Sequence, residues 1–149
     1  MKIHESLPNR QSGVMLLEAL ISILIFSIGI LAIIGLLAAS VKNAGDAKYR
    51  SDASLLTTEL FAEMETSNRT QATLQTNFQT GGAGYNTWLP YVYTRLPGVS
   101  GVPANQPVVT IVPNIATATP SSQVTITLYW NAPSEAPQAH QFVAVADVI

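Results

Sequence analysis

One apolar segment constrains this chain more than any other feature. Residues 13–41 contain a single charged residue, Glu18, in a run that is otherwise uncharged. About 20 apolar residues are enough for a helix to cross the hydrocarbon core of a bilayer. We therefore predict one transmembrane helix over residues 14–41. A carboxylate costs roughly 2.5–3.5 kcal/mol at the centre of such a helix, so Glu18 is a candidate functional residue.

The residues before this run form a short polar leader. Residues 1–13 include Lys2 and Arg10, and they end on Gly13 directly before the apolar segment. A secretory signal has its cleavage site after the apolar stretch. Here the plausible cut lies before it, between Gly13 and Val14. Cleavage at that bond would leave the helix on the mature protein.

The polar leader, the glycine, the acidic residue five positions later and the apolar helix together resemble the class III signal of type IV pilins and pseudopilins. The resemblance implies that a prepilin peptidase cleaves between Gly13 and Val14 and N-methylates the new terminus at Val14. Family members usually have phenylalanine at that position, a departure that bears on methylation more than on cleavage. Lys and Arg residues on the two sides of the helix do not decide its orientation. The resemblance places the N-terminus in the cytoplasm.

Glu18 lies four residues from the new terminus. When helices bundle, its carboxylate can neutralise the Val14 amine of the next subunit. Their attraction is on the order of 4 kcal/mol at 4 Å and an effective dielectric constant near 20, enough to set axial register. The alternative is that Glu18 lies among lipid headgroups, where a carboxylate costs little.

Composition narrows the remaining function classes. The chain has 149 residues, a net charge of −2 and no cysteine. Neither a disulfide framework nor a thiolate metal site is therefore available. The small charge and the lack of a basic run argue against direct nucleic-acid binding. His4 and His140 are too isolated to build a metal site, and no catalytic motif is present. We expect no cofactor and no enzymatic activity.

The helix is predicted to continue beyond the membrane over residues 42–67, which contain no proline. One apolar stripe of helical period follows it, formed by Tyr49, Ala53, Leu56, Leu60 and Met64. Three carboxylates crowd its last turns, those of Glu59, Glu63 and Glu65. They form either a solvated face or a face that meets a basic zone on a neighbouring subunit.

The remaining residues are predicted to form an αβ-loop over 68–107 and an antiparallel sheet over 108–149. Within the loop, residues 76–84 are expected to be irregular, and Thr87 is expected to cap a short helix with Pro90 in its first turn. Residues 91–94 suit a strand equally well. Strands are predicted at 108–112, 124–130 and 142–148. Alternation in the second strand directs four residues to one face: Val124, Ile126, Leu128 and Trp130. Trp88 and Trp130 are expected in the core, and His140 in an exposed turn.

The predicted fold class is α+β, with a long N-terminal transmembrane helix packed by its C-terminal half on a small antiparallel sheet. This layout matches the pilin architecture. Trp88, the Leu-Pro-Gly turn at 96–98 and the strand at 124–130 resemble PilV-type minor pilins. The resulting domain plan is a cleaved leader (1–13), a transmembrane and assembly half of the helix (14–41) and a periplasmic globular domain (42–149).

The resemblance implies a structural subunit held in the bacterial inner membrane by one span and then incorporated into a pilus at the cell surface. Such a minor pilin primes or modifies type IV pilus assembly, with adhesion, twitching motility or DNA uptake downstream. Its partners would be the prepilin peptidase, other minor pilins and the major pilin. One alternative is a pseudopilin of a type II secretion system. An alternative of another class is a single-span membrane protein with a ligand-binding or enzymatic domain.

Overall fold

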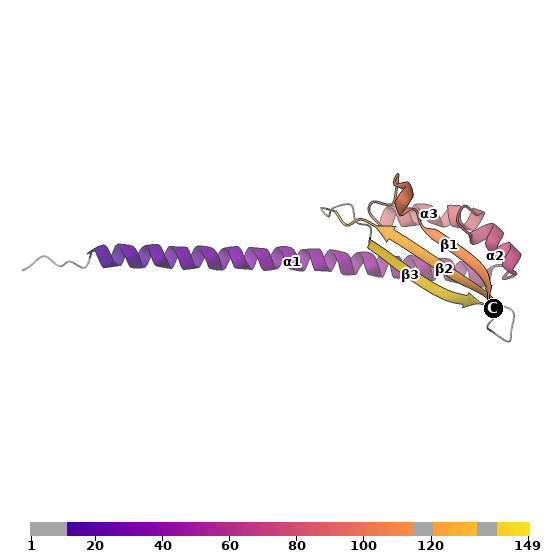
Figure 1. Cartoon of the computed structure of the whole chain (residues 1–149), viewed down its shortest axis with the longest axis horizontal. Helices are drawn as coiled ribbons and strands as arrows, with labels where there is room; N and C mark the ends of the chain where they lie inside the picture. The colour runs from indigo at the N-terminus through magenta and orange to yellow at the C-terminus, as the bar shows by residue number, and fades with distance from the viewer. Residues whose placement is uncertain (1–11, 115–120, 134–139) are drawn as a thin grey trace, which may run out of the picture. The chain divides into compact units, whose positions relative to one another are not determined.

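The computed structural model describes residues 12–114, 121–133 and 140–149 (Figure 1). Within these residues helices precede strands, which is the α+β layout that the sequence predicts. The elements are α1 (Ser12–Thr66), α2 (Gln71–Phe78), α3 (Ala83–Arg95), the 3-10 turn η1 (Pro103–Asn105), β1 (Val108–Asn114), β2 (Ser121–Trp130) and β3 (His140–Val148). The chain separates into two compact units, and the boundary falls within α1 between Asn43 and Ala44.

α1 is continuous because no proline interrupts it between Ser12 and Thr66. Local hydrogen bonds then end the helix. The backbone N–H and the hydroxyl of Ser67 both donate to the Met64 carbonyl, at 3.2 and 2.8 Å. The side-chain oxygen of Asn68 accepts the Thr70 N–H at 3.1 Å. These bonds satisfy groups that the helix end would leave without partners. The predicted long helix is confirmed.

The N-terminal part of α1 exposes its apolar side chains on every side. Leu16, Phe26 and Leu31 are 68, 68 and 74% exposed. A helix on the surface of a soluble domain buries one apolar stripe and keeps the other side polar. By length and composition α1 could cross a membrane, and it is the one such helix among the described residues. Its apolar surface therefore suits lipid or the apolar faces of other helices.

The C-terminal part of α1 instead buries one stripe. Ala53, Leu56, Leu60 and Met64 are completely inaccessible to solvent, and Tyr49 packs against them at the edge. The inward-facing side chains of β2 belong to the same buried cluster. The stripe predicted from the helical period is therefore confirmed as the core face of this helix.

β1, β2 and β3 form one antiparallel sheet with β2 in the centre. Every second residue of β2 is buried, as the alternation predicts. The register places Val109 opposite Ile126 and Ile126 opposite Ala144, so inward-facing residues form rows across the sheet. The three predicted strands are confirmed, and each is longer than expected. Pro113 lies inside β1, where an edge strand tolerates proline because only one side of it needs ladder hydrogen bonds.

The sequence prediction of a helix starting near Thr87 is wrong. α3 begins at Ala83 with Gly82 as its N-cap, and residues 76–78 belong to α2. Gly81 has a φ of +91°, and a Cβ atom on Gly82 would overlap the carbonyl oxygen of Asn77. The two glycines therefore make a tight connection between two helices, which only residues without a side chain allow.

The expected position of Pro90 in a first helical turn is also wrong, because Pro90 lies inside α3. Its ring removes the hydrogen bond to the carbonyl of Asn86. Both residues are on the exposed side of α3, so that carbonyl can bond to water instead. Residues 91–94 are helical, which excludes the strand that their composition also suited.

Two aromatic side chains fix α3 in the C-terminal unit. The indole Nε1 of Trp88 donates to the Leu56 carbonyl of α1 at 3.1 Å. The hydroxyl of Tyr85 donates to the Pro107 carbonyl, directly before β1, at 2.8 Å. Both rings are buried, and their centroids lie 6.1 Å apart. Buried Trp and Tyr normally find a partner for their polar atom. The predicted packing role of Trp88 is confirmed.

His140 corrects another expectation from the sequence. It is the first residue of β3, not part of an exposed turn, and its ring stacks on Trp130. The ring centroids lie 5.6 Å apart, with 14° between the planes. Trp130 itself is buried, as predicted for a core residue.

We expect Leu60→Ala to cost roughly 2–5 kcal/mol of the free energy of unfolding, because the lost side chain leaves a cavity in a fully buried stripe. Leu55→Ala on the same helix is the control, since the Leu55 side chain is 50% exposed. Urea unfolding of a fragment covering residues 44–149 measures both changes. Equal midpoints for the two variants would contradict the packing of α1.

Burial raises the pKa of Tyr85 above its ordinary value of 10.0. The unfolded chain therefore loses this proton first as the pH rises. The stability that Tyr85 contributes is complete below pH 10.0 and is lost as the pH rises through the higher folded-state pKa. Tyr85→Phe should cost about 0.5–1.5 kcal/mol at neutral pH, through loss of the bond to Pro107. The difference in the free energy of unfolding between the variant and wild type should shrink above pH 10.0. Urea unfolding of both proteins across this pH range measures the difference. A difference that does not change with pH would refute the assignment.

Candidate functional site

The structure places all three predicted site residues at the start of α1. Gly13 and Val14 lie in its first turn, and Glu18 follows in the next turn. Residues 1–11, which make up most of the predicted leader, lie outside the described residues. The candidate site is therefore described from Gly13 onward.

Gly13 is not required by the packing of this chain. A Cβ atom at this position would meet no atom within 4 Å. The backbone here is helical, which any residue other than proline adopts without strain. The first four N–H groups of a helix also lack partners within it, and glycine weakens such a turn further. The bond between Gly13 and Val14 therefore lies in a turn that is held by fewer hydrogen bonds than the interior of α1.

Val14 and Glu18 lie on one face of α1, because residues four apart are neighbours on a helix. Together with Leu17, Ile21 and Ser22 they line one groove along the surface of the helix. Val14 and Leu17 are 66 and 59% exposed. Glu18 is thus a single carboxylate in an exposed apolar strip, and burial of that strip in an apolar environment would require a partner for its charge.

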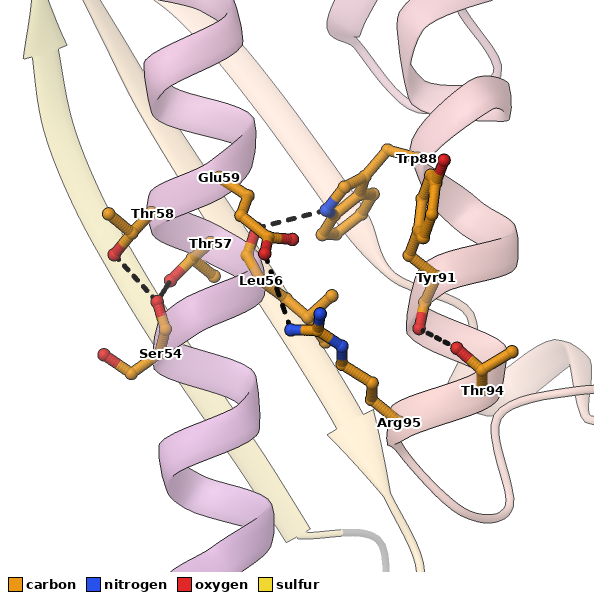
Figure 2. A network of polar contacts seen from close by, with 9 residues as sticks. All are labelled: Ser54, Leu56, Thr57, Thr58, Glu59, Trp88, Tyr91, Thr94 and Arg95. Atoms are coloured by element: carbon orange, nitrogen blue, oxygen red, sulfur yellow. Dashed lines mark hydrogen bonds and ion pairs between the residues drawn. The ribbon is translucent and has the colours of Figure 1, made fainter.

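A second polar feature lies between α1 and α3 in the C-terminal unit (Figure 2). It is a groove of about 300 Å³, lined by Glu59 and Glu63 of α1 and by Thr87, Trp88, Tyr91 and Arg95 of α3. The guanidinium of Arg95 reaches across it to the carboxylate of Glu59 at 3.5 Å. Both side chains are partly exposed, so this ion pair contributes little to stability.

Two ion pairs partly neutralise the carboxylates at the C-terminal end of α1. Glu59 pairs with Arg95, and Glu65 pairs with Arg69, each at 3.5 Å. Two of the three carboxylates thus have a cation of their own chain nearby, and a basic zone on a neighbouring subunit is not needed for them. The Arg95–Glu59 pair spans 36 positions. The spacing of Trp88, Tyr91 and Arg95 places the three residues on one face of α3. It does not point to Glu59, so the sequence carried no signal for this pair.

The chemistry available around this groove is limited. Its lining offers two carboxylates, one guanidinium, the hydroxyls of Thr87 and Tyr91, and two aromatic rings. The nearby hydroxyls of Thr57 and Thr58 both donate to the Ser54 carbonyl, at 2.9 and 2.8 Å (Figure 2). In the described parts of the chain, no group of three or more His, Cys, Asp or Glu side chains could hold a metal ion. The groove joins α3 to α1 and contains no nucleophile with an adjacent base.

No family model, curated protein or solved structure matches the chain. Its function must therefore be inferred from its own residues and their geometry.

Proposed function

We propose that this chain is a minor pilin, a non-enzymatic structural subunit that primes or modifies type IV pilus assembly. One observation carries the proposal. A single helix, α1, has an apolar N-terminal half that is exposed on all sides and contains one carboxylate, and a C-terminal half that buries one stripe in a core shared with an antiparallel sheet. The N-terminal half of such a helix can lie in a membrane or a helix bundle, and the C-terminal half forms part of the core of a domain.

The proposal assigns residues 1–13 to a leader that a prepilin peptidase removes. Support comes from Gly13, whose side-chain position is open in this chain. Gly29 is equally open, so the place of Gly13 directly before the apolar run carries the assignment. The open position means that a larger residue at 13 should leave the fold intact, and its effect on processing would report on the peptidase. Cleavage would make Val14 the first residue of α1, with a free amine that the peptidase can methylate.

The proposal also gives Glu18 its role. A free amine on Val14 adds a positive charge to the same helix face that carries the Glu18 carboxylate. In a bundle of apolar helices the two charges attract by several kcal/mol, which favours the axial register that brings them together. The partners would be the N-terminal helix halves of the major pilin and of other minor pilins. Before assembly the helix would hold the subunit in the inner membrane, with its domain in the periplasm.

A pseudopilin of a type II secretion system would share the leader, the helix and the carboxylate. The location of the wild-type protein separates the two functions. A minor pilin is recovered in sheared pili, whereas a pseudopilin is absent from them and is required for protein secretion.

Gly13→Trp should abolish cleavage, because a peptidase that fits a residue without a side chain has no room for an indole. The variant should keep residues 1–13 and remain in the membrane as a larger precursor. Intact mass and N-terminal sequencing of the membrane protein measure this. Gly29→Trp is the control, since Gly29 also has open space around it but lies away from the cleavage bond. Normal processing of Gly13→Trp would exclude the proposed signal.

Glu18→Ala should be inserted and processed normally but lost from fibres. The change removes a charge that is costly in the membrane, so insertion does not suffer. It also leaves the Val14 amine of a neighbour without its partner, and breaking one side of a buried ion pair costs roughly 3–5 kcal/mol. Immunoblots of membrane and sheared-pilus fractions compare the variant with wild type and with Glu65→Ala. Equal amounts of all three in fibres would show that Glu18 has no role in assembly.

A further inference from the structure

The groove between α1 and α3 carries one more negative charge than positive charge. Its lining includes the carboxylates of Glu59 and Glu63 and the guanidinium of Arg95. Arg95 pairs with Glu59 at 3.5 Å. The Glu63 carboxylate forms no ion pair or hydrogen bond with any side chain of the described residues. One further cation beside Glu63 would therefore balance the charge of the groove.

Tyr91 adds an exposed aromatic ring to the same groove (Figure 2). Tyr91 is 58% exposed, whereas Trp88 beside it is 3% exposed. A cation over the face of an aromatic ring is attracted by the electrons of the ring. Arginine suits this position better than lysine, because its planar guanidinium stacks on aromatic rings and can form two parallel hydrogen bonds with a carboxylate. The groove thus has the features of a site for an arginine side chain.

The C-terminal unit itself carries one arginine without an ion pair. Lys48, Arg69 and Arg95 each pair with a carboxylate of the chain. Arg50 is exposed and forms no ion pair within the described residues, although Asp46 lies four positions before it on α1. The unpaired guanidinium and the unpaired carboxylate in the groove therefore belong to the same unit.

We propose that the groove binds Arg50 of a second copy of this chain. The guanidinium would donate hydrogen bonds to the Glu63 carboxylate and lie against the Tyr91 ring. Charge complementarity identifies the occupant, because each copy carries the unpaired group that the groove of the other copy lacks. The inference does not depend on the proposed function, since Arg50 and every residue that lines the groove lie in the C-terminal unit.

The positions of the two residues determine how the copies are arranged. Arg50 and Glu63 lie on one helix, about 20 Å apart along its axis and about 140° apart around it. A contact about a two-fold axis would need both residues in one interface, since each copy then offers the same surface. Their separation around α1 places them in two different interfaces. Each copy therefore offers its groove to one neighbour and its Arg50 to another, which joins copies in a row.

Site-specific photo-crosslinking in cells that express two differently tagged full-length copies tests the contact. The photoreactive amino acid p-benzoylphenylalanine replaces Tyr91 in one copy, and the other copy keeps the wild-type sequence. We expect an adduct between the two copies, with mass spectrometry placing the joined residue in the turn of α1 around Arg50. Val145 is the matched control, because it is also 58% exposed but lies on β3. A crosslinker at position 145 should not join that turn.

Charge reversal supplies the second readout. With the crosslinker at position 91, Glu63→Arg in the crosslinker copy should lower the adduct yield about tenfold, because like charges then meet. Arg50→Glu in the other copy should have the same effect. The two changes together should restore the yield, since they exchange the signs of one pair. Lys48→Glu in the other copy should leave the yield unchanged, because Lys48 pairs with Asp52 of its own chain at 2.8 Å.

Three outcomes would overturn the proposal. An adduct with a different protein, or with another part of this chain, would show that the groove has a different occupant. Absence of any adduct would show that the groove has none. An adduct whose yield the paired charge reversals do not restore would show that no ion pair forms. The cleavage of Gly13→Trp and the fibre content of Glu18→Ala are measured separately, so failure here leaves those results untouched.

Discussion

Burial of one stripe of α1 is the contact on which the C-terminal unit depends. Leu56, Leu60 and Met64 are fully buried in a cluster with the inner face of β2. A three-stranded sheet with one apolar face is not stable in water without a covering layer. The same stretch of helix also holds α3, because the Leu56 carbonyl accepts the Trp88 indole N–H. Loss of this packing would expose the sheet and release α3 together.

α1 shows how one continuous helix can have two different surfaces. Its backbone geometry does not change between the halves, so the difference lies in the side chains alone. In the N-terminal half apolar residues surround the axis, and in the C-terminal half they repeat every three or four residues. The first pattern leaves no polar side for water, whereas the second leaves charged residues such as Glu59 and Lys48 outside. The proposed division between assembly and domain support follows from this contrast.

The two edge strands of the sheet differ in whether other segments cover them. α2 and the residues that connect it to α3 supply side chains that complete the β1 edge, through Gln75 and Thr80. The β1 edge is therefore closed to an added strand. Within the described residues, the backbone of residues 141–148 in β3 has hydrogen bonds only in the ladder with β2. The difference between the two edges arises because α2 and the turn after it fold back onto β1.

The sequence by itself determined the features that depend on local periodicity. The extent of α1, its buried stripe and the alternation in β2 could all be predicted, because helix and strand periods are properties of neighbouring residues. Gly13, Val14 and Glu18 could be named as candidates for the same reason, since their spacing along one segment is what singles them out. The start of α3 could not be predicted from the sequence, because the small residues at 81–84 are typical of a loop. Only the structure shows that Gly82 lies against the Asn77 carbonyl and directly precedes the helix.

Only the tertiary structure decided which distant residues meet. Arg95 lies near Glu59, His140 stacks on Trp130, and Gln75 bonds to the Ile111 carbonyl. The contacts of Arg95 and Gln75 depend on the path of α2 and α3 across the unit, and the stack of His140 on Trp130 depends on the register of β2 and β3. Local pattern specifies neither. The same path covers one edge of the sheet and leaves the other open. The physical reason is that an edge strand forms its remaining hydrogen bonds with whichever segment packs beside it. Packing of the whole core decides which segment that is.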